Sequence, residues 1–149
     1  NNSNYFRNTT AEEDEINYYT DSIIGQVTTS AMSQEQKLKA CYDWTVHNCT
    51  YKSVFTSVPG NYSFKQWYGL NMLKTRQGNC YSYASAFAIL ADRLGYNANV
   101  VQGYIQTQSG RWSAHGWVEI SGVKYDPEIE WAHGYNCYAG ASPRVYKYQ

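Results

Sequence analysis

A cysteine, a histidine and an aspartate are spaced along this sequence so that they could form a nucleophilic catalytic site. Cys80 follows a turn-forming stretch, residues 76–79, and begins a segment with helical periodicity. The thiolate is the nucleophilic form of cysteine, and a helix N-terminus stabilises it through unpaired amide groups and the helix dipole. Gly78 would let the chain turn sharply and leave room for a substrate backbone. Cys80 is therefore the candidate nucleophile.

His115 and Asp126 could supply the base and the carboxylate that such a nucleophile needs. His115 lies in a strand-like stretch, on the same face as Trp117. Ser121-Gly122 is typical of a two-residue turn, and the resulting register puts Asp126 opposite Trp117 and diagonal to His115. Diagonal neighbours lie about 7–8 Å apart at the backbone, close enough for side chains to meet. A carboxylate there would fix the imidazole tautomer and stabilise its charged form, as in a catalytic triad.

The pairing register leaves one alternative for the carboxylate. Asp126 precedes Pro127, a pair that is common in turns. A shift of one residue would move Asp126 to the opposite face of the sheet. Glu128, which the predicted register places opposite His115, would then be the alternative carboxylate.

The elements that must position these residues are helices first and strands afterwards. Helical periodicity predicts a helix over residues 12–29, and Ser33 with Gln36 forms a capping-box pattern that begins a second helix. Residues 49–76 are predicted to be an irregular connection with a short helix near residues 64–73. Cys80 begins a third helix, which Gly95 ends.

Three strands follow these helices. Stretches rich in Val, Ile, Tyr and Trp predict strands over Ala98–Gln106, residues 114–120 and residues 123–126. Helices followed by strands indicate an α+β domain.

The motifs around these residues resemble the core of the transglutaminase-like superfamily, in its bacterial-type minimal form. The matching blocks occur in the usual order and are GNCYSYA at residues 78–84, LGY at 94–96, VQGY at 101–104, HGWVE at 115–119 and YDP at 125–127. Residues 76–127 carry the core motifs, and residues 128–149 add little to the match. The resemblance implies one domain over residues 1–149 with the papain-like α+β fold, in which N-terminal helices pack on an antiparallel sheet.

The resemblance also implies a role for each residue of the site. Cys80 would be the nucleophile, His115 the base and then the acid, and Asp126 the group that orients His115. The backbone amide of Cys80 is a candidate oxyanion donor, because amides at a helix N-terminus are unpaired.

Members of the family often take a second oxyanion donor from an upstream aromatic or polar side chain. Tyr51 is the best positional candidate, with Trp67 and Tyr68 behind it. Trp117, beside His115, is a candidate wall of the acyl site.

Composition excludes several classes of function. Among the 149 residues, 12 Lys and Arg balance 12 Asp and Glu, which gives no electrostatic case for a nucleic-acid or anionic-membrane partner. No apolar run is long enough to span a membrane. No EF-type calcium loop or Gly-rich phosphate loop is visible, so we expect no metal and no cofactor.

The polar, aromatic composition bears on location and on the cysteines. Sixteen Tyr and five Trp, together with the polar residues 1–4, favour a secreted or cell-surface protein. In that case two of Cys41, Cys49 and Cys137 could pair; Cys41, on an apolar helical stripe, is expected to be buried and reduced.

The expected chemistry is acyl transfer at an amide bond of a protein or peptide, with a cell-wall peptide as one candidate partner. A thioester on Cys80 could be resolved by an amine, giving a cross-link, or by water, giving deamidation. A cysteine peptidase of the same fold is one alternative. The other is a non-catalytic surface module that binds peptide or glycan through its Tyr and Trp side chains.

Overall fold

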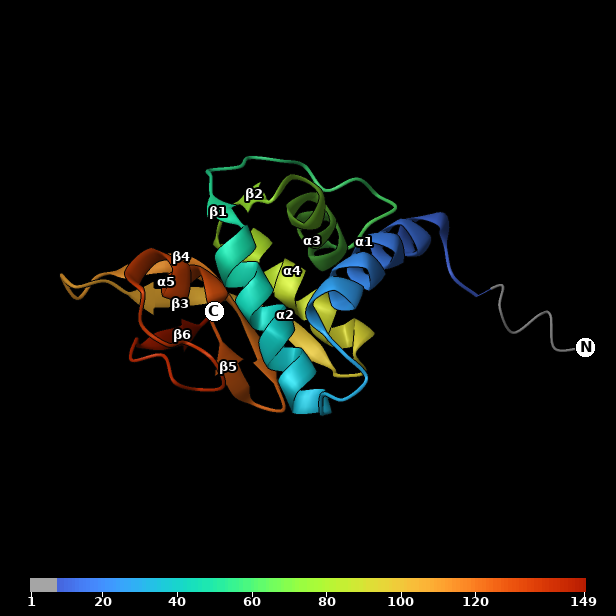
Figure 1. The fold of residues 1–149 in the computed structure, drawn as a ribbon. Helices are drawn as coiled ribbons and strands as arrows, with labels where there is room; N and C mark the ends of the chain where they lie inside the picture. The colour runs from blue at the N-terminus through green and yellow to red at the C-terminus, as the bar shows by residue number, and fades with distance from the viewer. Residues whose placement is uncertain (1–7) are drawn as a thin grey trace, which may run out of the picture.

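A computed structural model describes residues 8–149, so residues 1–7, including the polar start considered above, lie outside the described part. Figure 1 shows the arrangement of the elements. The helices are α1 (Ala11–Val27), α2 (Gln34–Asn48), α3 (Phe64–Thr75), α4 (Cys80–Arg93) and α5 (Pro127–His133). The strands are β1 (Thr50–Tyr51), β2 (Gln77–Gly78), β3 (Ala98–Gln106), β4 (Trp112–Ile120), β5 (Val123–Tyr125) and β6 (Tyr146–Tyr148).

The helix N-termini are defined by their own sequences. At α2, Ser33 and Gln36 form the predicted capping box, in which each side chain binds the backbone N–H of the other residue. Equivalent boxes begin α1, α3 and α4. The predicted short helix near residues 64–73 is confirmed as α3, and the predicted start of α4 at Cys80 is also confirmed.

The sheet is antiparallel and has the strand order β5-β4-β3-β6. Ile120 pairs with Val123, and Val118 pairs with Tyr125. The two turn residues, Ser121 and Gly122, both have positive φ, 51° and 79°, as a two-residue hairpin loop requires. The predicted register of this hairpin is therefore confirmed, although β5 ends at Tyr125, one residue earlier than expected.

The C-terminal residues form elements that the sequence motifs did not reveal. Asp126 caps α5 and Pro127 occupies its first turn, so Glu128 lies on a helix and not on a strand opposite His115. β6 then returns along the other edge of β3, where Tyr146 pairs with Ile105.

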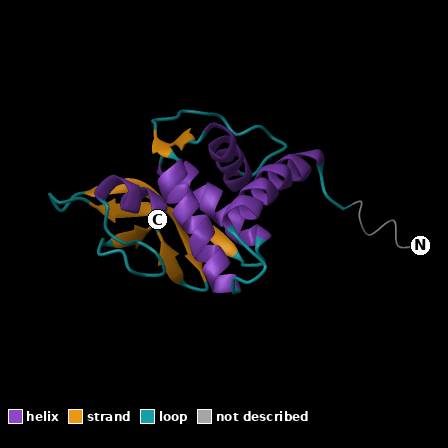
Figure 2. Cartoon of the chain, viewed as in Figure 1, coloured by secondary structure: helices purple, strands orange, loops and turns teal. Residues whose placement is uncertain are grey.

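α4 packs against α1, α2 and α3 on one side and against the four-stranded sheet on the other. Figure 2 shows α1 to α4 gathered on one side and the four-stranded sheet on the other, with α5 beside the sheet. One face of α4, including Phe87 and Ala91, packs with Val118 and Ile120 of β4. The opposite face packs with α1, α2 and α3. Burial on both faces fixes this helix, and therefore its N-terminus.

Two further findings concern cysteines and membranes. All four cysteines are buried free thiols, as expected for Cys41, and the suggested pairing among Cys41, Cys49 and Cys137 is not formed. Across residues 8–149, no helix has both the length and the apolar character needed to cross a membrane.

Candidate active site

Cys80 is the first residue of α4 and is 9 % exposed. Its position is fixed by Asn79, whose side-chain oxygen accepts a hydrogen bond of 3.1 Å from the Ser82 amide. Gly78 is required for a reason other than the predicted one, because a Cβ at this position would lie 2.3 Å from the Ser82 Cβ. Gly78 is therefore needed because the first turn of α4 packs closely against it, and not because a substrate needs open space there.

His115 and Asp126 are both buried, at 3 % and 1 % exposure, and are joined directly. His115 Nε2 lies 2.7 Å from Asp126 Oδ2. The same oxygen accepts a hydrogen bond of 2.8 Å from the Tyr146 hydroxyl, and Asp126 Oδ1 accepts one of 3.2 Å from the Ile129 amide. The carboxylate is thus held from three directions and can in turn hold the imidazole.

The imidazole is stabilised in its charged form. Burial alone would lower the pKa of His115, but hydrogen bonds and charge interactions with Asp126 and Cys80 outweigh burial and raise this pKa to about 10. Because Nε2 faces Asp126, Nδ1 is the ring nitrogen available to a reacting group. The arrangement brings together the three residues that the sequence analysis selected: the imidazole is hydrogen-bonded to the Asp126 carboxylate and lines one cavity with Cys80.

Glu128 lies on the other side of the same imidazole. Its Oε1 atom is 3.9 Å from His115 Nδ1, beyond hydrogen-bond distance, and its side chain is 12 % exposed. Burial raises the pKa of Glu128, and the negative charge of Asp126 acts in the same direction. Both carboxylates considered from the sequence therefore lie near His115, but only Asp126 is hydrogen-bonded to it.

Cys80 and His115 open into a cavity of about 290 Å³. Besides these two residues, its lining includes Tyr51, Glu128, His133 and Arg144. The last three come from α5 and the segment before β6, and of these the sequence analysis considered only Glu128, as the alternative carboxylate. No spacing rule signals His133 and Arg144, because they reach the cavity only through α5 and the return of the chain to β3.

Tyr51 is the only one of the four predicted oxyanion or substrate residues that lines this cavity. The parallel pairing of β1 with β2 sets Tyr51 beside Gly78, close to the start of α4. Its ring, 44 % exposed, stacks on Trp131 at a centroid distance of 6.3 Å. Tyr51 is therefore positioned to contact a group bound at Cys80.

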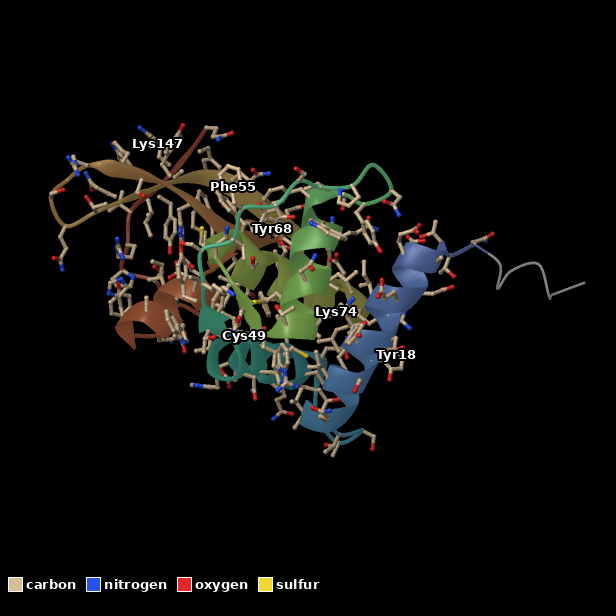
Figure 3. All side chains as sticks on the ribbon, turned by 90° about the horizontal axis from the view of Figure 1, so that it is seen from above. Tyr18, Cys49, Phe55, Tyr68, Lys74 and Lys147 are labelled. Carbon is tan, nitrogen blue, oxygen red and sulfur yellow. The ribbon has the colours of Figure 1, made fainter. Side chains whose placement is uncertain are left out.

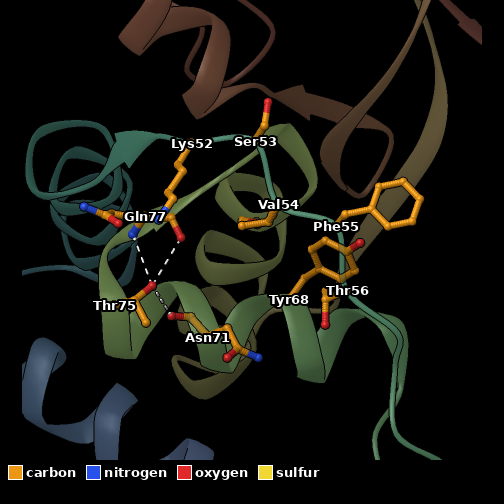
Figure 4. Close-up of a pocket in the computed structure, with 10 residues that line it drawn as sticks. Lys52, Ser53, Val54, Phe55, Thr56, Tyr68, Asn71, Thr75 and Gln77 are labelled. Carbon is orange, nitrogen blue, oxygen red and sulfur yellow. Dashed lines mark hydrogen bonds between the residues drawn. The ribbon is translucent and has the colours of Figure 1, made fainter.

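Tyr68 and Trp67 lie elsewhere. Tyr68 lines a separate groove of about 370 Å³ between α3 and residues 52–56 (Figure 4). Phe55 and Tyr68 are close together there, as Figure 3 also shows. Trp67 donates a hydrogen bond of 3.1 Å to Thr56 and packs against Tyr62, outside the catalytic cavity.

Trp117 is fully buried and so cannot form the exposed wall of an acyl site. Its ring packs against Tyr146, with ring centroids 4.8 Å apart, and lies nearly parallel to the His115 ring at 6.4 Å. Trp117 therefore supports the imidazole from behind.

The fold and the sequence resemble known proteins. A solved structure described as a "putative cysteine protease" from Cytophaga hutchinsonii matches with a TM-score of 0.50 and 17% identity, over 91% of this chain and 47% of that chain. The chain thus spans about half the length of that protein, and at this identity the likeness concerns the fold alone. No curated protein matches the chain.

The family comparison covers the segment that contains the site. The model of the transglutaminase-like superfamily matches residues 21–134, which include Cys80, His115 and Asp126. The fold is the papain-like, transglutaminase-core fold that the motifs implied. Because the match covers more than half of its length, the chain belongs to the transglutaminase-like superfamily.

Proposed function

We propose that this protein transfers or hydrolyses acyl groups at amide bonds of proteins or peptides, through a thioester on Cys80. The family and the structural neighbour support cysteine-peptidase or acyltransferase chemistry in general. The observation that carries the proposal is the buried His115, held by Asp126 at 2.7 Å and lining one cavity together with Cys80.

The first half of the reaction forms the thioester. The Cys80 thiolate attacks the amide carbon, and a C–S bond forms as the carbonyl oxygen becomes an oxyanion. His115 Nδ1 gives its proton to the leaving nitrogen, and the C–N bond breaks. Asp126 keeps the imidazole oriented throughout. The unpaired backbone amide of Cys80 and the Tyr51 hydroxyl are the candidate oxyanion donors.

The outcome of the second half of the reaction depends on whether water or an amine attacks the thioester. Water or an amine loses a proton to His115 Nδ1 and attacks the thioester, and the thiolate leaves. An amine gives a cross-link, whereas water gives deamidation or peptide cleavage according to which amide was attacked. We favour the transglutaminase-like outcome, and a peptidase is the alternative within the same chemistry.

The groove beside α3 is the candidate site for the rest of a peptide substrate. It begins at residues 52–54, directly after Tyr51, and reaches Ser82 in the first turn of α4. Asn79, which caps α4, also donates a hydrogen bond of 3.4 Å to the Val54 carbonyl. The groove and the catalytic cavity are therefore linked by one short segment. A non-catalytic surface module that binds peptide or glycan would use the same groove.

The experiment compares three products from one glutamine-containing protein substrate. Ammonia release, incorporation of a labelled primary amine and peptide cleavage are measured for the protein and for Cys80→Ser. Amine incorporation that Cys80→Ser abolishes supports the transglutaminase-like outcome, and cleavage alone supports the peptidase. Equal values for the protein and Cys80→Ser in all three assays would contradict catalysis by Cys80.

The expected cell-wall peptide partner, the secreted or cell-surface location, the exclusion of nucleic acid and the absence of a cofactor stay predictions from the sequence.

A further inference from the structure

Glu128 is a buried carboxylate that lines the catalytic cavity without a partner of its own. The residue is 9 % exposed and lines the cavity together with Cys80 and His115. Among residues 8–149, the only group of opposite charge within ion-pair distance is the His115 ring, whose Nδ1 lies 3.9 Å from Glu128 Oε1. That distance is too long for a hydrogen bond. A buried carboxylate is costly without a compensating charge or hydrogen bond, so the cavity offers a place for a bound cation.

Arg144 is the other positive group on the cavity wall, and it is directed to other partners. Its Nη2 donates a hydrogen bond of 2.9 Å to the Gln106 carbonyl. Its Nη1 donates one of 3.4 Å to the Tyr135 hydroxyl and lies 3.3 Å from His133 Nε2. Arg144 therefore adds positive charge to the wall but forms no ion pair with Glu128.

The proposed reaction removes the positive charge that lies nearest to Glu128. When the thioester forms, His115 Nδ1 gives its proton to the leaving nitrogen, and the ring becomes neutral. Glu128 then has no positive group within ion-pair distance. Burial raises the pKa of Glu128, and a bound cation would act in the opposite direction and favour the carboxylate.

The cavity and the groove beside α3 are two hollows with different walls. The groove is lined mainly by residues 52–56 and α3 (Figure 4). The cavity is lined mainly by β4 and α5. If the acyl chain lies in the groove, the side of the cavity that contains Glu128 stays open to a second substrate.

We propose that Glu128 binds the acyl acceptor, a primary alkylamine in its ammonium form, and so favours amine transfer over hydrolysis. This assignment rests on the proposed function, because the amine attacks the thioester on Cys80. The ammonium group gives one proton to the Glu128 carboxylate and becomes a neutral amine. The amine nitrogen then forms a C–N bond as the C–S bond breaks, and His115 Nδ1 takes its second proton. Cys80 leaves as the thiolate, and the proton on Glu128 passes to solvent.

The kinetic test compares two acceptors of different charge on the same glutamine-containing donor. A blocked lysine amide is an ammonium ion at neutral pH, whereas hydroxylamine is uncharged. Glu128→Gln should raise KM for the lysine amide by about tenfold or more, while KM for hydroxylamine and the first-turnover burst of ammonia change less than about twofold. An equal rise in KM for both acceptors, or an equal loss of the ammonia burst, would overturn the proposal.

Glu130→Gln is the matched control on the same helix. The Glu130 carboxylate accepts hydrogen bonds of 2.9 Å from the Tyr42 hydroxyl and from the Cys137 amide, and a glutamine carbonyl can accept both. This variant should leave KM for both acceptors unchanged. Circular dichroism verifies that both variants are folded. A rise in KM for the lysine amide that is as large in Glu130→Gln would overturn the assignment to Glu128.

A binding measurement separates the acceptor site from the acyl-transfer activity. Cys80→Ser lowers the pKa of His115, because the thiol is one of the groups that raise it, and so approaches the charge state of the thioester form. In this variant, NMR titration with the blocked lysine amide should give an affinity that the added Glu128→Gln reduces by about tenfold or more. Blocked norleucine amide, which has the hydrocarbon stem but no ammonium group, should bind no more tightly than the lysine amide does after Glu128→Gln.

The two outcomes can be told apart. Affinity that depends on Glu128, in a protein that incorporates no amine, would support the cation site and contradict acyl transfer. Amine incorporation that Cys80→Ser abolishes, with an affinity and a KM that Glu128→Gln leaves unchanged, would support acyl transfer and overturn the role of Glu128.

Discussion

At the scale of single residues, the proposed chemistry depends on the charged groups around one buried ring, the imidazole of His115. Burial favours the neutral imidazole, but Asp126 and Cys80 both favour the imidazolium and prevail. With its pKa raised, the ring holds a proton that it can donate to the leaving nitrogen at neutral pH, where a free imidazole is largely deprotonated. The acid of the proposed mechanism is therefore already charged before a substrate binds.

The protonation of His115 can be measured directly. We expect NMR of its ring nitrogens to show imidazolium through neutral pH and a pKa of about 10. In Cys80→Ser the pKa should fall, because the thiol is one of the groups that raise it, but should stay above the ordinary value because Asp126 remains. A pKa at or below the ordinary value of about 6.5 would contradict this description of the site.

The variant Tyr146→Phe tests whether the hydrogen bond from Tyr146 to Asp126 stabilises the folded protein. Tyr146→Phe removes the donor to Asp126 Oδ2 and should lower the free energy of unfolding by about 1.5–3 kcal/mol, the usual contribution of a hydrogen bond to a charged group. Urea unfolding measures this loss.

Tyr148→Phe is the matched control for Tyr146→Phe. Tyr148 also donates to a carboxylate, that of Glu119, but is 55 % exposed, so the change should stay within about 0.5 kcal/mol. Equal losses in both variants would mean that the bond to Asp126 has no special structural role.

At the scale of elements, the sequence predicted what local rules determine. The capping box at Ser33 and the turn at Ser121-Gly122 are local, and α2 and the β4–β5 register follow them. β3 was predicted to its exact ends because the stretch is rich in the strand-forming residues Val, Ile and Tyr. By contrast, β6 is three residues long and is a strand only because it pairs with β3.

The residues of the site also fall into two groups, those that local patterns predict and those that depend on tertiary contacts. Cys80, His115 and Asp126 could be found because each lies at a helix start, on a strand or next to a hairpin. Tyr146 and Arg144 reach the site through tertiary contacts between segments distant in sequence, which no local pattern specifies. Trp117 was placed on the correct face, but burial by Tyr146 could not be foreseen without β6.

The cap of α4 gives a prediction at this scale. Asn79→Ala should cost about 1 kcal/mol of stability and should also reduce the rate of acyl transfer, because the loosened first turn carries Cys80. Ser33→Ala removes an equivalent cap at α2, so thermal unfolding should show a similar loss while acyl transfer stays unchanged. Equal activity in the two variants would mean that the cap does not position the nucleophile.

At the scale of the whole molecule, the site exists only where the sheet meets α4. Gly116 follows His115, Tyr81 follows Cys80, and these two neighbours are in contact. A Cβ on Gly116 would lie 2.5 Å from the Tyr81 ring, so the sheet can approach the helix this closely only with glycine at this position. The contact sets the distance between the layers that carry sulfur and imidazole.

Gly116→Ala should therefore push the two layers apart. We expect a loss of about 1–3 kcal/mol, as for other overpacked cores, together with slower acyl transfer. Gly25 on α1 is the control, because a Cβ there meets nothing within 4 Å; Gly25→Ala should be neutral or slightly stabilising in the same unfolding assay. Full activity in Gly116→Ala would show that the layer distance is not critical.

The most direct test of the central claim is the rate at which each thiol reacts with iodoacetamide at neutral pH, followed by mass spectrometry. Cys80 should be alkylated far faster than the buried Cys41, Cys49 and Cys137, and His115→Gln, verified as folded, should slow the reaction of Cys80 alone. A Cys80 that reacts no faster than the other three thiols, or whose rate is unchanged in His115→Gln, would contradict a functional pairing of sulfur and imidazole.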